Sequence, residues 1–307
     1  MKIPHPPRIT HQPRKGVKPK MHRALLIGIS FLALVPSARA TEQEYTREVA
    51  RWQVVSIPPK TDPGARVAKL HAASDSEHKW RVFADRSQIC AQLTTAQPPE
   101  QRDQPTFTPK AGQFREASSF ARVDDGWLVG FNQGEFGAAL YWFSPGGQRD
   151  YKISNHQVVD FFSLPDGIHA IEGLAHLSMS TGSIIRITRP EPDARWQAST
   201  VTKLPYAPYA ISVRRDGTML VTLSDSLVSV GKDRKITTLL SDAGWEGLYP
   251  NSSVLSPDQQ KLYIGMRQFV GEFDISKKKL RLLVPSPAFL NLLTKEDEQQ
   301  IRKRYGR

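Results

Sequence analysis

The sequence predicts an all-β protein assembled from a repeated unit of four short strands. Its 307 residues include 20 Gly and 23 Pro, which favours many turns over long helices. Turn signals recur at matching places, namely Asp125-Gly126, Asp166-Gly167, Asp216-Gly217 and Pro257-Asp258. Each signal follows one strand-like run and precedes another, so the chain repeats a strand–turn–strand pattern.

The spacing of these turns indicates the architecture. With Gly126, Gly167, Gly217 and Gln259 as markers, the intervals are 41, 50 and 42 residues. A period of roughly 40 to 50 residues is typical of propellers, with one four-stranded sheet per repeat. A β-sandwich of the same strands is the alternative, but sandwiches seldom repeat such a unit four times. We therefore predict a β-propeller of about five four-stranded blades, or six if residues 42–112 contribute more than one.

Alternation of apolar and polar residues and β-branched content place the individual strands. The predicted strands of four repeats are 120–123, 127–131, 139–143 and 151–154; 158–164, 168–174, 183–188 and 196–201; 209–213, 218–222, 227–230 and 236–240; and 252–256, 261–265, 269–273 and 280–284. Residues 42–95 are less regular, but runs at 52–57, 66–70, 79–83 and 88–93 predict a further blade.

The chain divides into three parts. Residues 1–40 form an extension and a secretory signal, residues 41–285 the propeller, and residues 286–307 a helical tail. A Pro-rich loop at 95–112 interrupts the propeller. In the tail, Thr294 and Asp297 form a variant capping box before a helix at 297–305, which covers a sheet edge or, alternatively, binds a partner.

Residues 21–40 have the pattern of a signal peptide. An apolar run, Ala24–Val35, is followed by a helix breaker and by Ala38-x-Ala40, which predicts cleavage after Ala40. The run is too short to span a bilayer, and a buried core helix is the alternative. Translation from Met21 would place this signal at the very start. We expect a periplasmic or secreted protein with no membrane span after cleavage.

Charge and cysteine content restrict the partners. The formal net charge is +12, but residues 1–40 carry eight Lys and Arg and no acid, so the remainder has a charge of only +4. This argues against a nucleic-acid partner. The single cysteine, Cys90, excludes a disulfide framework and suits an oxidising compartment. We expect a monomer.

Two segments, Ala210–Val221 and Pro250–Ile264, resemble the β-propeller superfamily, particularly its NHL-like and gluconolactonase-like (SMP-thirty) branches. The resemblance covers residues 113–285 best and is architectural. It implies that ligands bind on the face formed by second-to-third strand loops and blade-to-blade loops.

Aromatic and charged residues gather in those loops. Aromatics give flat apolar area, and Arg and Glu supply orientation. The candidate ligand-binding residues are Tyr206, Tyr209, Trp245, Glu246, Tyr249, Asn251, Arg267 and Glu135. The alternative for the aromatics is that they fill the space between blades.

The sequence predicts no metal or cofactor. The gluconolactonase-like branch holds a divalent cation with a Glu, two Asn and an Asp, and only Asn251 matches that pattern here. Tyr209 stands where another ligand would be needed, so Ca²⁺ or another divalent cation at Asn251 is the alternative. The spacing of His156, His169, Glu172 and His176 fits no zinc motif.

These observations favour an exported binding or interaction protein of the bacterial cell envelope, which recognises a protein or glycan on an aromatic-lined loop face. The alternative is a divalent-cation-dependent hydrolase of the lactonase-like type. A third reading is a scaffold that joins an envelope complex through its C-terminal helix.

Overall fold

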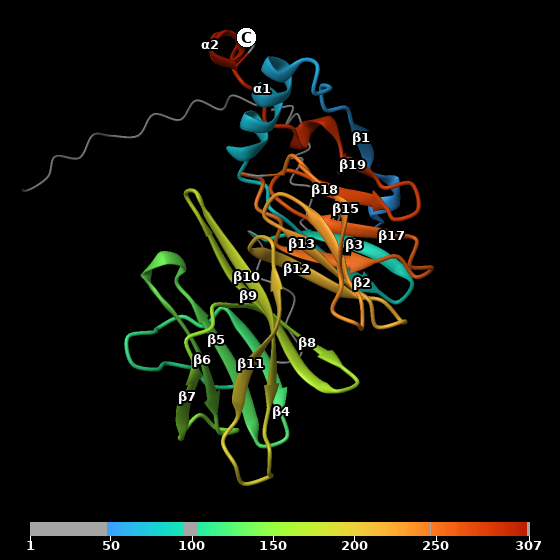
Figure 1. Ribbon diagram of the computed structural model, residues 1–307. Coiled ribbons are helices and arrows are strands. Elements are labelled where there is room, and N and C mark those ends of the chain that lie inside the picture. Colours follow the sequence, from blue (N-terminus) through green and yellow to red (C-terminus); the bar gives the residue numbers. More distant parts are fainter. Residues whose placement is uncertain (1–47, 95–103, 246, 306–307) are drawn as a thin grey trace, which may run out of the picture. The chain divides into compact units, whose positions relative to one another are not determined.

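The computed structural model describes residues 48–94, 104–245 and 247–305, and Figure 1 labels its helices and most of its strands. The predicted extension and signal peptide lie outside these residues, as do residues 95–103 of the Pro-rich loop. Within the described chain, four successive antiparallel sheets each take their strands in sequence order. The predicted all-β, propeller-like class is confirmed.

Each sheet is a meander of four strands. The first consists of β4 (Ser119–Val123), β5 (Gly126–Asn132), β6 (Ala138–Phe143) and β7 (Asp150–Ser154); the second of β8 (Val158–Leu164), β9 (Gly167–His176), β10 (Met179–Thr188) and β11 (Gln197–Leu204). The third consists of β12 (Pro208–Val213), β13 (Met219–Leu223), β14 (Leu227–Val230) and β15 (Ile236–Leu240), and the fourth of β16 (Ser252–Leu255), β17 (Lys261–Gly265), β18 (Val270–Asp274) and β19 (Lys279–Val284).

The core lies between successive sheets. Leu128 of the first sheet and Ile185 of the second share one apolar cluster, and Val221 of the third joins Ile184 of the second in another. A further cluster unites the third and fourth sheets and includes Phe273. The opening strands β4, β8, β12 and β16 contact one another in that order. Successive sheets therefore pack face to face, as propeller blades do, and the outer face of the first sheet is covered by the segment that contains Ala111 and Phe114.

The N-terminal part departs from the prediction. The strand β1 (Gln53–Val55) pairs with β19, so the fourth sheet gains a fifth, outermost strand. The strand predicted at 66–70 is wrong, because these residues lie inside α1 (Pro63–Ser74). The side chain of Asp62 accepts a hydrogen bond from the backbone N–H of Ala65 (3.1 Å), and Pro63 occupies the first turn. Both features start helices.

The other two N-terminal strands, β2 (Trp80–Asp85) and β3 (Gln88–Leu93), form a two-stranded sheet rather than a complete blade. Trp80 is fully buried, and β2 packs beside β16 and β17. The indole of Trp80 contacts the indole of Trp52 (4.7 Å between ring centres) and the phenyl ring of Phe289 (5.4 Å). The N-terminal segment therefore covers a face of the last sheet that would otherwise be exposed.

The C-terminal tail contains a short 3₁₀ turn, η4 (Pro287–Phe289), and the helix α2 (Lys295–Tyr305). The predicted terminal helix is confirmed, and Thr294 caps it, since its hydroxyl accepts a hydrogen bond from the N–H of Asp297 (3.1 Å). The helix contacts α1, and the side chain of Asn291 donates to the carbonyl of Ala72 (2.9 Å). None of the helices that the structure describes has the length and apolarity needed to cross a bilayer.

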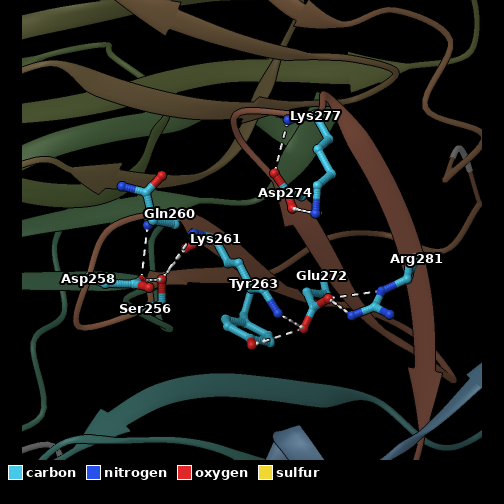
Figure 2. A network of polar contacts seen from close by, with 9 residues as sticks. All are labelled: Ser256, Asp258, Gln260, Lys261, Tyr263, Glu272, Asp274, Lys277 and Arg281. Atoms are coloured by element: carbon cyan, nitrogen blue, oxygen red, sulfur yellow. Dashed lines mark hydrogen bonds and ion pairs between the residues drawn. The ribbon is translucent and has the colours of Figure 1, made fainter.

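A buried carboxylate fixes the register of β17, β18 and β19 (Figure 2). Glu272 accepts hydrogen bonds from Arg281 (Nε, 2.9 Å), Lys261 (3.2 Å) and the hydroxyl of Tyr263 (3.0 Å). Burial alone would raise the pKa of Glu272, but the three donors outweigh it and the net pKa is lowered. The pKa of Tyr263 is raised, first by burial and then by the negative charge of Glu272.

We expect Glu272→Gln to lower the free energy of unfolding at pH 7 by about 2–3 kcal/mol, because it leaves the cationic partners of a buried carboxylate unmatched. The folded-state pKa of Glu272 is lowered, so its contribution is present above the ordinary Glu pKa and is lost as the pH falls through the folded value. Urea unfolding of both proteins between about pH 7 and pH 3 measures this difference.

The control is Glu298→Gln, which removes an exposed carboxylate paired with Arg302 and should cost less than about 0.5 kcal/mol. A stability difference between wild type and Glu272→Gln that stays constant down to pH 3 would contradict the role assigned to the ionised carboxylate.

Candidate functional site

Exposed apolar side chains concentrate on the loops of one face. We call this surface the loop face, and it consists of residues 133–137, 177–179, 205–207 and 241–251, with residue 246 outside the described chain. Among the described residues, eight large hydrophobic side chains are exposed, and five belong to this face: Phe136, Leu177, Met179, Tyr206 and Tyr249. Leu177 has 92% of its surface exposed. Exposed apolar side chains that gather on one face mark a candidate binding surface.

The hairpin of β9 and β10 supplies the most exposed members. Both strands have ten residues, whereas β8 pairs only as far along β9 as Glu172. The part of the hairpin after Glu172, with its turn at Leu177 and Ser178, therefore extends past the end of β8. Leu177 has a φ of 51°, and both it and Met179 are exposed. Apolar residues at a solvated turn carry a solvation cost, so a binding role accounts for them better than folding does.

The base of this hairpin is packed tightly. A Cβ at Gly182 would lie 2.8 Å from the carbonyl oxygen of Tyr206, too close for any side chain. The hydroxyl of Ser180 contacts that of Ser224 (3.0 Å) and accepts a hydrogen bond from the N–H of Ala207 (2.9 Å). The hairpin is therefore anchored to the loops of the third sheet.

The other side of the hairpin is held by the loop between β5 and β6, which contains the 3₁₀ turn η3 (Gly134–Phe136). The carboxylate of Glu135 lies 2.8 Å from Nε2 of His176. The side chain of Gln157 donates to Oδ1 of Asn132 (2.9 Å) and to the carbonyl of Gly134 (2.8 Å). Loops of three successive sheets thus form one connected surface, which reduces the entropy lost on binding.

A cation–π pair lies on the same face. The guanidinium of Arg267 lies 5.1 Å from the ring centre of Tyr249, and Tyr249 has 55% of its surface exposed. The same guanidinium donates to the carbonyl of Ser74 at the end of α1, and the backbone N–H of Arg267 donates to Leu248 (2.7 Å). Both predicted residues therefore meet in space and are held in place by the protein.

The structure does not place the other candidates from the sequence among these exposed residues. Trp245 belongs to the core between the third and fourth sheets, with 1% of its surface exposed, and its indole N–H donates to the carbonyl of Leu223 (3.0 Å). This is the space-filling alternative stated above. Tyr209 is half-buried in β12, and Glu246 lies outside the described residues. Phe136, Leu177 and Met179 were missed, although apolar residues at predicted loops were visible in the sequence.

The lactonase-like alternative depends on Asn251. Its Nδ2 donates to the carbonyl of Trp80 (3.0 Å), and its Oδ1 accepts from the hydroxyl of Ser252 (2.9 Å). Both ends of the side chain are therefore engaged by the protein. In the described ranges there is no group of three or more His, Cys, Asp or Glu that could hold a metal ion.

Asp160 lies on the opening strand β8, and the pKa of its carboxyl group is raised. Removal of water by the surrounding protein is the main cause, while the N–H of Phe161 and the charge of Arg81 oppose this shift. Enzymes use carboxyl groups of raised pKa as acids, but such an acid also needs a substrate within hydrogen-bond reach. Asp160 by itself does not define an active site.

No family model matches the sequence, and no curated protein matches it. Among solved structures, the chain is similar to virginiamycin B lyase from Staphylococcus aureus (14% identity, 56% of this chain and 57% of that one, TM-score 0.38). It is also similar to a gluconolactonase from Xanthomonas campestris (12% identity, 67% and 65% covered, TM-score 0.39) and to a chain of a nidogen/laminin complex (8% identity, 58% and 67% covered, TM-score 0.40). The chain spans a little more than half the length of the lyase structures. These are distant similarities of a propeller-like architecture.

The different burial of two neighbouring aromatics gives a direct test. Trp245→Ala should lower the free energy of unfolding by about 3–5 kcal/mol, because it opens a cavity between two sheets. Tyr249→Ala should change it by about 0.5 kcal/mol or less, since most of that ring is exposed. Denaturant unfolding monitored by circular dichroism measures both, and equal losses would refute the distinction between core and surface.

Proposed function

We propose that the protein is an exported binding protein of the cell envelope, and that its loop face recognises a protein partner. The observation that carries the proposal is the gathering of Phe136, Leu177, Met179, Tyr206 and Tyr249 on connected loops of one face. Apolar and aromatic anchors of this kind supply most of the binding energy at interfaces.

The composition of the loop face favours a protein over a glycan. Sugar rings stack on flat aromatic side chains, whereas Leu177 and Met179 are flexible aliphatic groups that pack into apolar pockets. Around them, the pair of Glu135 and His176 and the guanidinium of Arg267 provide charged groups. Interfaces commonly surround apolar anchors with such a polar rim.

Export is part of the proposal and depends on residues 21–40, which lie outside the described chain. The order of apolar run, helix breaker and small-residue cleavage site supports it. The only thiol, that of Cys90, is buried, which suits a compartment where exposed thiols would mispair.

Position-specific cross-linking tests the loop face in the native host. The photoreactive residue benzoylphenylalanine replaces Phe136 or Leu177 in the full chain, and in control proteins it replaces Val54 or Leu292, which are exposed apolar residues outside the loop face. We expect one discrete protein adduct from the two loop positions and none from the controls.

The variant Leu177→Asn completes this test, because Asn tolerates the left-handed backbone found at that position. It should reduce the adduct formed from position 136 by about tenfold without lowering the melting temperature. Equal labelling from loop and control positions would overturn the proposal. Specific binding to a glycan array, lost in Leu177→Asn, would replace the protein partner by a glycan.

A further inference from the structure

A pocket lies at the ends of the strands opposite to the loop face. It has a volume of about 460 Å³ and opens where the β8–β9, β12–β13 and β14–β15 turns meet. We call it the arginine pocket, and its charged lining consists of Asp166, Arg214, Arg215, Asp216, Lys232 and Arg234. A cavity of this size is within the range that holds small organic ligands.

The lining is unbalanced in charge. Its four cationic side chains face two carboxylates, so the formal charge of the lining is +2. Asp216 is one of these two carboxylates, and it accepts a hydrogen bond from the N–H of Thr218 (2.9 Å). That bond is the main reason why its pKa is lowered. With both carboxylates counted, the lining still has an excess of two positive charges that a ligand could match.

The carboxylate of Asp166 lies near three side-chain nitrogen atoms without forming a normal hydrogen bond to any of them. Its Oδ2 lies 3.6 Å from Nε of Arg186, 3.9 Å from Nη2 of Arg234 and 3.8 Å from Nε2 of His169. These distances exceed normal hydrogen bonds. The carboxylate therefore attracts the two guanidinium groups without binding their nearest N–H groups, while another nitrogen of Arg186 donates to the backbone carbonyl of Asp166 (2.6 Å).

Several donors in this region lack an acceptor. Among the described residues, Nε of Arg214 and Nη1 of Arg234, which both line the pocket, are buried and have no hydrogen-bond partner. Nε of Arg186, which lies beside Asp166, is in the same state. Unsatisfied donors of this kind are rare in proteins and call for a specific explanation, and here two of them line one cationic pocket.

The pocket also has apolar walls. Leu164, Pro165, Val213 and Met219 line it beside the charged groups. A ligand that fills the pocket therefore needs an apolar body as well as a negatively charged group.

We propose that the arginine pocket binds a small organic phosphate monoester. Such a group carries a charge of about −1.5 to −2 at pH 7, which matches the lining. Its tetrahedral oxygens accept paired N–H donors from arginine, the geometry for which guanidinium groups are suited. The site is distinct from the loop face, so it goes beyond the binding function proposed above.

Isothermal titration of the purified full chain at low ionic strength tests the assignment. The probes are phenyl phosphate, inorganic phosphate and benzyl alcohol. We expect phenyl phosphate to bind at least about tenfold more tightly than inorganic phosphate, because only the ester uses both the cations and the apolar walls. Benzyl alcohol, which lacks the charge, should show no binding.

Arg214→Gln and Arg234→Gln should each weaken phenyl phosphate binding by at least about tenfold. The matched control, Lys152→Gln, removes one exposed positive charge from β7 in the first sheet and should change the affinity less than about twofold. The melting temperatures of all variants are measured alongside. If an arginine-to-glutamine variant melts at a lower temperature than the wild type, the affinity of Arg234→Lys is measured instead, because this variant keeps the positive charge but removes the paired N–H donation.

Absence of phenyl phosphate binding would overturn the proposal, and so would equal losses in the arginine variants and in Lys152→Gln. Inorganic phosphate that binds as tightly as phenyl phosphate would overturn the assignment of an ester. Because the loop-face experiment uses other residues and another readout, failure of one proposal leaves the other intact.

Discussion

The burial of Trp80 against the fourth sheet is the interaction on which the rest of the molecule depends. Each meander sheet has two apolar faces, and the first three interfaces are filled by the next sheet along the chain. The fourth sheet has no successor, so β2 and β3 cover it. The backbone N–H of Trp80 donates to Met266, its indole N–H donates to Gln268, and its carbonyl accepts from Asn251. One residue thus joins both ends of the described chain.

Periodicity predicted the repeated part of the fold because each strand there is buried by a neighbour of the same kind. The strands at 227–230, 236–240 and 261–265 were placed at their observed bounds. The N-terminal segment has no such repeated environment. Its strand β1 completes a sheet more than 200 residues away, and alternation within 52–57 contains no information about that partner. The helix α1 was misread as a strand, although Asp62-Pro63 is a local signal for a helix start.

The surface chemistry could be predicted only in part, because exposure depends on packing between distant segments. Trp245 and Tyr249 are four residues apart, and the same composition argument selected both. The structure buries Trp245 in the core cluster that includes Ala73 of α1 and residues of the third and fourth sheets. Tyr249 stays exposed and lies against the guanidinium of Arg267. The arginine pocket was not predicted at all, since Asp166, Arg214 and Arg234 come from different hairpins of two sheets. Single turns of this kind look like solvated hairpin tips when they are read one at a time.

The two surfaces are separated by the length of β9. This strand begins at Gly167, next to Asp166 of the arginine pocket, and ends at His176, next to Leu177 of the loop face. A strand advances about 3.3 Å per residue, so ten residues place the two surfaces roughly 30 Å apart. Ligands at the two ends do not touch, and substitutions at such distances normally act additively. The cross-strand bonds that fix β9 between β8 and β10 therefore hold both surfaces on one rigid element while leaving their chemistry independent.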